Sequence, residues 1–123
     1  AETMKKLLIT LLLVSPFSSA DWGDVYYCNM TSYSALGING VRRDKTLEKF
    51  QFKLDKEKQA MVFGSGGDLG GSTIKVTDET KTTPEAWYSR EPLQRAQFVG
   101  GMFLYSLFIP IEVTTMTANC DKF

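Results

Sequence analysis

The 123-residue sequence contains no histidine and only two cysteines. Without histidine, neither a Ser-His-Asp nor a Cys-His catalytic site can be assembled, and zinc sites that use imidazole ligands are excluded. Two cysteines are too few to hold a metal ion with thiolates alone. We therefore expect that the protein is not an enzyme and that it carries no cofactor and no metal ion.

The sequence also lacks an excess of either charge, because 14 lysine and arginine residues balance 14 aspartate and glutamate residues. The basic residues are scattered along the chain instead of forming a cluster. Because proteins that bind nucleic acid present a basic face, we expect no nucleic-acid partner.

No apolar run reaches the roughly 20 residues that a helix needs to span a bilayer. The two most apolar runs are residues 7–14 and residues 99–111. We therefore predict no transmembrane segment in the mature chain. The simplest interpretation of residues 99–111 is a buried strand that bends at Gly100 and Gly101 and ends at Pro110. The alternative is an exposed apolar edge or patch that binds a partner or an apolar ligand.

The first 20 residues have the features of a cleavable signal peptide. Met4 is followed by Lys5 and Lys6, then by the apolar run 7–14 and a small-residue cleavage site that ends at Ala20. We predict that residues 1–20 are an N-terminal extension plus the signal peptide and that residues 21–123 are a single β domain. The mature protein is then exported, to the periplasm or the extracellular space.

Cys28 lies near the start of the mature chain and Cys120 lies near its end. An even number of cysteines in an exported chain indicates a disulfide, because that compartment is oxidising. We predict a Cys28–Cys120 bond that closes almost the whole domain and places the first and last strands side by side. A reactive or metal-binding thiol is the alternative, but the sequence has no histidine to activate it.

Alternation of apolar and polar residues dominates the rest of the chain and is typical of half-buried β-strands. In KFQFKLD, Phe50, Phe52 and Leu54 share one face, while Gln51, Asp55 and the lysines share the other. We predict an all-β fold, a single small antiparallel barrel or barrel-like sandwich of about seven or eight strands. The same pattern predicts inward faces for Tyr26, Cys28 and Met30, for Ile74 and Val76, and for Met116, Ala118 and Cys120.

Turn signals separate these strands. DKEKQ at residues 55–59 predicts a polar turn before a strand at residues 60–63, and Asn39 followed by Gly40 is an Asn-Gly turn signal. Further strands are expected at residues 86–91 and 94–99.

Residues 63–76, FGSGGDLGGSTIKV, contain five glycines within eight positions. The glycine spacing matches a phosphate-binding P-loop, but Ser72 stands where that motif needs a lysine, and a strand-like segment follows instead of a helix. We interpret the stretch as a flexible glycine-rich connection between two strands. Gly66, Gly67 and Asp68 are candidate binding residues, because this loop is expected beside a binding mouth.

The loop TPEAWYSREP holds the residue types that most often anchor interfaces, namely tryptophan, tyrosine and arginine. Trp87, Tyr88 and Arg90 are therefore candidate binding residues, with burial in the core as the alternative for Trp87 or Tyr88. The same region carries carboxylates of the kind that a two-carboxylate glycoside hydrolase would need. These are Asp78, Glu79, Glu85 and Glu91, which we interpret as solvated loop charges.

Several short motifs carry a resemblance to known proteins. YYC after the signal, KFQFK, VFGSGG and a closing CDKF resemble short exported β-rich proteins of aquatic bacteria, a group with no established activity. That resemblance therefore implies no function. A small periplasmic β-barrel with one cysteine in its first strand and another near its end also looks like the C-type lysozyme inhibitors of Gram-negative bacteria, but no motif of their inhibitory loops is found here.

These observations predict a non-enzymatic exported binding module that uses the barrel mouth or its loops, with a small apolar ligand or a protein as its partner. The alternatives are a periplasmic inhibitor of a lytic enzyme, a carboxylate-based hydrolase and a structural envelope component. An interior cavity lined by phenylalanines would favour a small ligand, whereas a filled interior with a rigid protruding loop would favour a protein partner. Two carboxylates that face each other across a cleft would favour the hydrolase.

Overall fold

The computed structural model describes residues 20–76, 86–89 and 91–123, and every regular element within them is a β-strand. The predicted all-β class is thus confirmed. The predicted signal peptide, up to residue 19, lies outside the described residues, as does Arg90. The described part contains no helix long and apolar enough to cross a membrane. The strands are β1 (Val25–Gly37), β2 (Arg42–Asp44), β3 (Lys49–Asp55), β4 (Ala60–Phe63), β5 (Thr73–Lys75), β6 (Ala86–Tyr88), β7 (Gln94–Val99), β8 (Met102–Ile109) and β9 (Glu112–Lys122).

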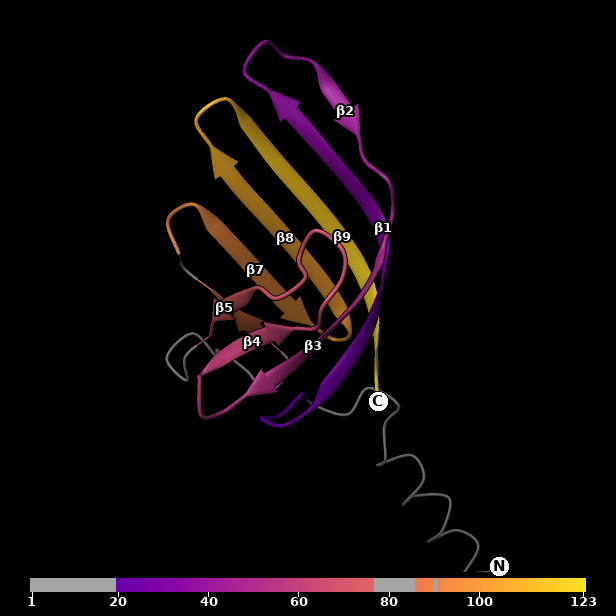
Figure 1. The fold of residues 1–123 in the computed structure, drawn as a ribbon, viewed down its shortest axis with the longest axis vertical. Coiled ribbons are helices and arrows are strands. Elements are labelled where there is room, and N and C mark those ends of the chain that lie inside the picture. The colour runs from indigo at the N-terminus through magenta and orange to yellow at the C-terminus, as the bar shows by residue number, and fades with distance from the viewer. Residues whose placement is uncertain (1–19, 77–85, 90) are drawn as a thin grey trace, which may run out of the picture.

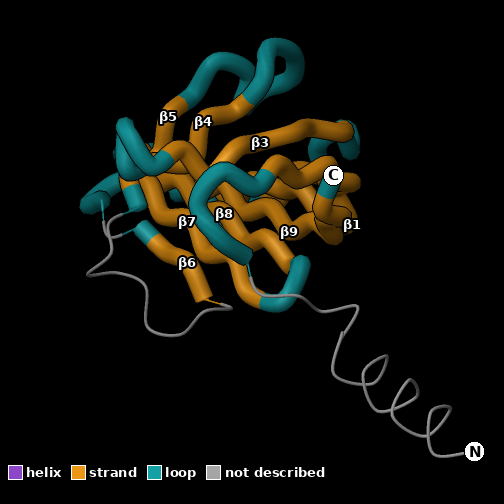
Figure 2. Tube along the Cα trace, turned by 90° about the horizontal axis from the view of Figure 1, so that it is seen from below, coloured by secondary structure: helices purple, strands orange, loops and turns teal. Residues whose placement is uncertain are grey.

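The strands form one sheet in the order β5-β4-β3-β1-β9-β8-β7-β6, and β2 pairs with β1 beside this path. Every strand pairing in it is antiparallel. The order is that of a meander whose first and last strands are neighbours. The sheet curls from β5 and β4 through β1 and β9 to β7 and β6, which gives a half-barrel (Figures 1 and 2).

β1 is the longest strand and is paired along both of its edges. Its residues 25–29 pair with β3 and its residues 34–36 pair with β2, while β9 follows the opposite edge along nearly the whole strand. Cys28 lies opposite Cys120 in the β1–β9 pairing, and their sulfur atoms form a disulfide. The structure confirms the predicted bond, and it confirms that the first and last long strands, β1 and β9, lie side by side.

The faces that the sequence pattern predicts as buried are the faces that the structure buries. On β3, Phe52 and Leu54 are buried and Phe50 packs against the core, while Lys49 and Gln51 are exposed. The polar turn before β4 also lies where it was predicted, at residues 56–59. The other predicted inward residues are buried as well: Tyr26, Cys28, Met30, Ile74, Val76, Met116, Ala118 and Cys120.

Residues 99–111 do not form the single bent strand that was expected. Gly100 and Gly101 have φ values of 56° and 81°, and they make a tight turn that reverses the chain between β7 and β8. The chain reverses again at Pro110, between β8 and β9. Only alternate residues of β8, Phe103 and Tyr105, are buried. The expectation of one buried strand is wrong because positive φ at two successive glycines permits a hairpin instead of a bend.

Aromatic rings fill the inside of the half-barrel. The ring of Phe52 contacts those of Tyr26, Phe63, Phe98 and Phe103 at centroid distances of 5.2 to 5.7 Å. Offset and edge-to-face contacts of this kind add to the stabilisation that burial provides. Among the described residues these rings form a packed aromatic core.

Candidate functional site

Two hairpin turns lie side by side at one end of the half-barrel. One joins β1 to β2 and the other joins β8 to β9, and both are near the top of Figure 1. The backbone N–H of Ile38 in the first turn donates to the carbonyl of Ile111 in the second, at an N–O distance of 2.9 Å. The two turns thus form one unit. We call its exposed apolar side chains the apolar hairpin end; they are Leu36, Ile38, Val41, Phe108, Ile109 and Ile111.

The apolar hairpin end is strongly exposed to solvent. Ile38 is 81% exposed, Ile111 is 65% exposed and Val41 is 62% exposed. Ile38, Val41 and Ile111 line one hollow, and Leu36 lines another. Several exposed aliphatic side chains at one end commonly mark a site of interaction, because their exposure to solvent is unfavourable. Among the described residues, the apolar hairpin end is the strongest candidate for a contact surface.

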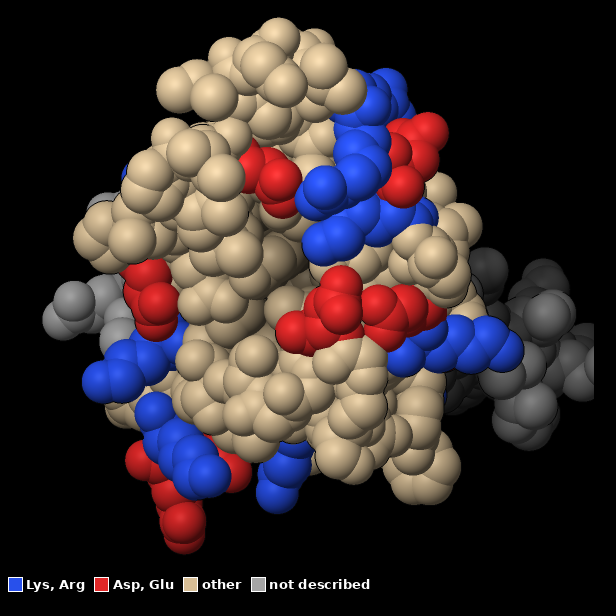
Figure 3. All heavy atoms as spheres, turned by 45° about the horizontal axis from the view of Figure 1, so that its top comes forward, with Lys and Arg blue, Asp and Glu red and all other residues tan. Residues whose placement is uncertain are grey.

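Charged side chains begin directly behind this end. Residues 36–41 and 108–111 contain none. The uppermost surface in Figure 3 is uncharged, and basic and acidic side chains gather beside it. Arg42 pairs with Asp44 at 3.3 Å and Arg43 pairs with Glu112 at 3.2 Å. These four residues, which we call the paired collar, carry no net charge.

Four backbone N–H groups at the apolar hairpin end are hydrogen-bonded within the end. The predicted Asn-Gly turn is present, and Gly40 adopts a φ of 82°, a conformation that favours glycine. Pro110 in the second turn has no N–H group to satisfy. Acceptors within the end satisfy the N–H groups of Gly37, Ile38, Gly40 and Val41. The end is therefore preorganised before it meets a partner.

A hollow of about 400 Å³ opens beside the apolar hairpin end. Ile38, Val41 and Ile111 line part of it, and Arg43 and Glu112 line another part. Its walls therefore combine aliphatic side chains with a neutralised ion pair.

The glycine-rich stretch between β4 and β5 is a loop that backbone hydrogen bonds fold back on itself. The N–H of Gly71 donates to the carbonyl of Gly64 at 3.1 Å, and the side chain of Leu69 is buried. The candidate residues Gly66 and Gly67 have φ values of 99° and 73°, which explains why glycine is needed at both positions. Backbone hydrogen bonds and the buried side chain of Leu69 thus anchor the loop between β4 and β5.

Asp68, the remaining candidate in this loop, connects the loop to Tyr33 on β1 and to Lys45. The hydroxyl of Tyr33 on β1 donates to Asp68 Oδ2, and Lys45 Nζ lies 3.8 Å from the same oxygen. Lys45 also lies over the Tyr33 ring, 4.6 Å from its centroid. Sequence reasoning missed Tyr33 and Lys45, because only the return of the loop onto β1 brings them to Asp68.

Two tyrosines on the concave side of the sheet are held as neutral phenols. Burial, reinforced by the hydrogen bond to Asp68, raises the pKa of Tyr33 above its ordinary value. Burial likewise raises the pKa of Tyr105, whose hydroxyl accepts a hydrogen bond of 2.8 Å from Gln94 Nε2. Near pH 7 these neutral phenols can donate and accept hydrogen bonds.

A third tyrosine, Tyr26, gives a testable dependence of stability on pH. Burial, with a smaller contribution from Asp24, raises its pKa from 10.0 to about 12. The unfolded chain therefore loses this proton first, and Tyr26 contributes a fall in the free energy of unfolding of up to ~1.4 kcal/mol per pH unit between about pH 10 and pH 12. The raised pKa values of Tyr33 and Tyr105 add to the decline in the same direction. Urea unfolding at pH 9, 10.5 and 11.5 measures this decline. Tyr26→Phe is expected to make the decline shallower, and an unchanged slope would contradict the assignment to Tyr26.

The structure separates the three candidates of the TPEAWYSREP loop. Trp87 is completely buried, and its ring meets that of Trp22 edge to face at a centroid distance of 4.8 Å. Its side chain therefore belongs to the core, which is the alternative to a surface anchor. Tyr88 is half-buried and lines a second surface hollow of about 600 Å³, together with Arg95 and Gln97 of β7. Arg90 lies outside the described residues.

Of the four carboxylates considered for hydrolysis, only Glu91 lies within the described residues. Glu91 accepts a hydrogen bond of 3.4 Å from the backbone N–H of Lys75 on β5. Asp78, Glu79 and Glu85 lie outside the described residues. Within residues 20–76, 86–89 and 91–123, no group of three potential ligands from histidine, cysteine, aspartate and glutamate could hold a metal ion.

The fold and these surfaces define a disulfide-tied antiparallel half-barrel with a packed interior and one apolar end. No protein-family model matches the chain, and the comparisons with curated proteins and with solved structures found no match.

Proposed function

We propose that the protein is a non-enzymatic exported binding module that contacts its partner through the apolar hairpin end. The exposure of Ile38, Val41 and Ile111 on two preorganised turns is the observation that carries the proposal. Their burial against a partner would stabilise the complex, since each aliphatic side chain contributes about 1.5–3 kcal/mol when fully buried. The Cys28–Cys120 bond is compatible with export, because disulfides persist in oxidising compartments.

The packed interior favours the end of the barrel over its inside as the place of binding. Phe52, Phe98 and Phe103 are almost completely buried, and the ring of Phe52 contacts both of the others. A small apolar ligand inside would have to displace these rings. Asp68 holds the glycine-rich loop in place through Tyr33 and Lys45, so its carboxylate has a structural role.

Site-specific photo-crosslinking tests this proposal. A benzophenone side chain is introduced in place of Ile38 or Ile111, and in place of Met102 as the matched control. Met102 lies in the turn region at the other end of β8 and is 65% exposed, as is Ile111. Each protein is irradiated with an extract of the producing cell's envelope.

Adducts are expected from positions 38 and 111, with few or none from position 102. A single adduct with a lytic enzyme would identify the protein as an inhibitor that uses this end as a plug. Equal adduct yields at all three positions, or none at positions 38 and 111, would overturn the proposal.

A further inference from the structure

We infer that the partner of the apolar hairpin end is a phospholipid bilayer, into whose surface the two turns insert side by side. This inference rests on the proposed function, because it names the partner of the same surface. The inserting side chains are Ile38, Val41 and Ile111, which are the most exposed members of the end.

The composition of the end fits hydrocarbon better than it fits a protein pocket. Five of its six side chains are aliphatic, and Phe108 is the single aromatic member. Protein interfaces are instead anchored mostly by tryptophan, tyrosine and arginine, and leucine and valine are under-represented among their energetic centres. Aliphatic side chains gain from transfer into acyl chains without any need for a complementary shape.

The position of the charges fits a boundary at the level of the lipid headgroups. The two turns are free of charge, and the paired collar starts one residue behind them, at Arg42 and at Glu112. Because Arg43 and Glu112 line the same hollow as Ile38, Val41 and Ile111, the insertion must be shallow to keep these charges out of hydrocarbon, where each would be costly. Because Arg42 pairs with Asp44 and Arg43 with Glu112, the collar gives little attraction to anionic lipid.

Four backbone N–H groups of the end are already hydrogen-bonded, which suits them to an environment with little water. Each unsatisfied backbone polar group in hydrocarbon costs several kcal/mol. In the β1–β2 turn, the N–H groups of Gly37, Gly40 and Val41 have acceptors within the turn. The N–H of Ile38 reaches across to Ile111, and Pro110 in the other turn carries no N–H. Shallow insertion therefore leaves these donors satisfied.

Vesicle flotation tests the inference. The chain from residue 21 to residue 123 is mixed with phosphatidylcholine vesicles, and the bound fraction is measured as a function of lipid concentration. A partition constant on the order of 10³–10⁴ M⁻¹ is expected, comparable to that of a single short acyl chain. Binding should change less than about 3-fold when a third of the lipid is phosphatidylglycerol, because the paired collar is neutral.

Two variants and a matched control locate the contact. The double variant Ile38→Asp/Ile111→Asp is expected to bind at least about 100-fold more weakly, because it removes two aliphatic groups and introduces charge. Met102→Asp, at an equally exposed position, is expected to bind as the unchanged chain does. Ile38→Ser/Ile111→Ser provides a milder change with an expected loss of at least about 10-fold. Circular dichroism confirms that each variant is folded.

A depth measurement adds an independent readout. Tryptophan is introduced as Ile38→Trp or, for comparison, as Met102→Trp, and the vesicles contain lipid brominated on its acyl chains. The additional emission of Ile38→Trp should be quenched by at least about half, and that of Met102→Trp should be unaffected.

The outcomes separate the inference from the proposed function. Flotation that both double variants weaken by at least the expected factors and that Met102→Asp preserves would support the inference. Absence of flotation, together with protein adducts at position 38 in the crosslinking experiment, would overturn the bilayer as partner and leave the proposed function standing. Absence of both would overturn both. Flotation that is equal for the unchanged chain and both double variants would overturn the assignment of the contact to this end.

Discussion

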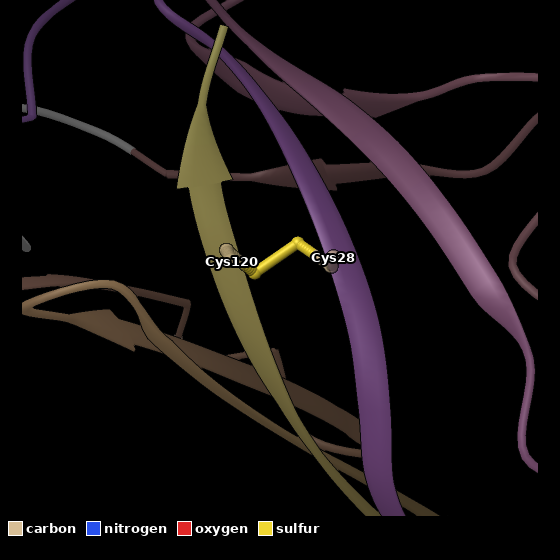
Figure 4. Close-up of a disulfide and its surroundings, with 2 residues drawn as sticks. All are labelled: Cys28 and Cys120. Carbon is tan, nitrogen blue, oxygen red and sulfur yellow. A yellow bond between two sulfur atoms is a disulfide. The ribbon is translucent and has the colours of Figure 1, made fainter.

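Removal of the Cys28–Cys120 disulfide is expected to lower the free energy of unfolding by about 4–5 kcal/mol. The bond joins two residues 92 apart in sequence, directly across the β1–β9 pair (Figure 4). It restricts the unfolded chain over nearly the whole domain, and the entropy of closing so long a loop sets the size of the effect. Because domains of this size are stable by about 5–15 kcal/mol, the loss would be a large share of the total. Urea unfolding of the Cys28→Ala/Cys120→Ala variant measures it.

Reductant provides the control for this experiment. It is expected to weaken the unchanged chain and to leave the double variant as it was. Intact mass before and after alkylation of the oxidised protein checks that both thiols are paired. A double variant within about 1 kcal/mol of the unchanged chain would contradict the expected role of the bond.

Trp87→Ala is expected to lower the free energy of unfolding by about 3–5 kcal/mol. Trp87 is completely buried, and its ring meets that of Trp22 edge to face at 4.8 Å. Truncation removes a large buried apolar area and leaves a cavity that the surrounding side chains fill only in part. Chemical denaturation followed by far-ultraviolet circular dichroism measures the change without relying on tryptophan fluorescence.

Tyr88→Ala is the matched control, because Tyr88 is the neighbouring residue of β6 and is half-buried. We expect it to cost less than about 1.5 kcal/mol. A surface anchor at Trp87 would behave in the opposite way: Trp87→Ala would then leave stability nearly unchanged and reduce the yield of crosslinks from position 38. That result would support a binding role for Trp87.

Strands with strict alternation were predictable from the sequence because their side-chain period is two. In β3, the apolar series Phe50, Phe52 and Leu54 requires one buried face, and a shift by one residue would expose all three. β6 shows the limit of this reasoning. Only three residues long, it gives too little of the pattern to show that Trp87 points inward.

The apolar hairpin end was not predicted, because its two turns are far apart in sequence. Residues 99–111 were recognised as the most apolar stretch, and the Asn-Gly signal at residues 39–40 was recognised as a turn. Their meeting depends on the register of β1 against β9. Counting ten residues from Cys28 and ten back from Cys120 pairs Ile38 with Pro110, and the bulge after Met30 shifts this by one residue to Ile111. The predicted disulfide thus fixed the pairing of the two turns to within one residue, but the bulge that completes the register could not be predicted from the sequence.

The candidates in the glycine-rich loop show a different limit. Glycine spacing indicated backbone conformation, and the positive φ values of Gly66 and Gly67 agree with that interpretation. Sequence gave no indication that the loop returns to Tyr33, since this contact depends on the tertiary position of Asp68.

Methyl NMR of the isoleucine side chains tests most directly whether binding occurs at the apolar hairpin end or in the interior. Residues 21–123 contain four isoleucines: Ile38, Ile109 and Ile111 belong to the end, and Ile74 is completely buried in the core. On titration with phosphatidylcholine nanodiscs or with envelope extract, the signals of the three end residues are expected to shift or broaden while that of Ile74 stays in place. A shift of Ile74 with unchanged end signals would contradict the account, because it would place the partner inside the half-barrel.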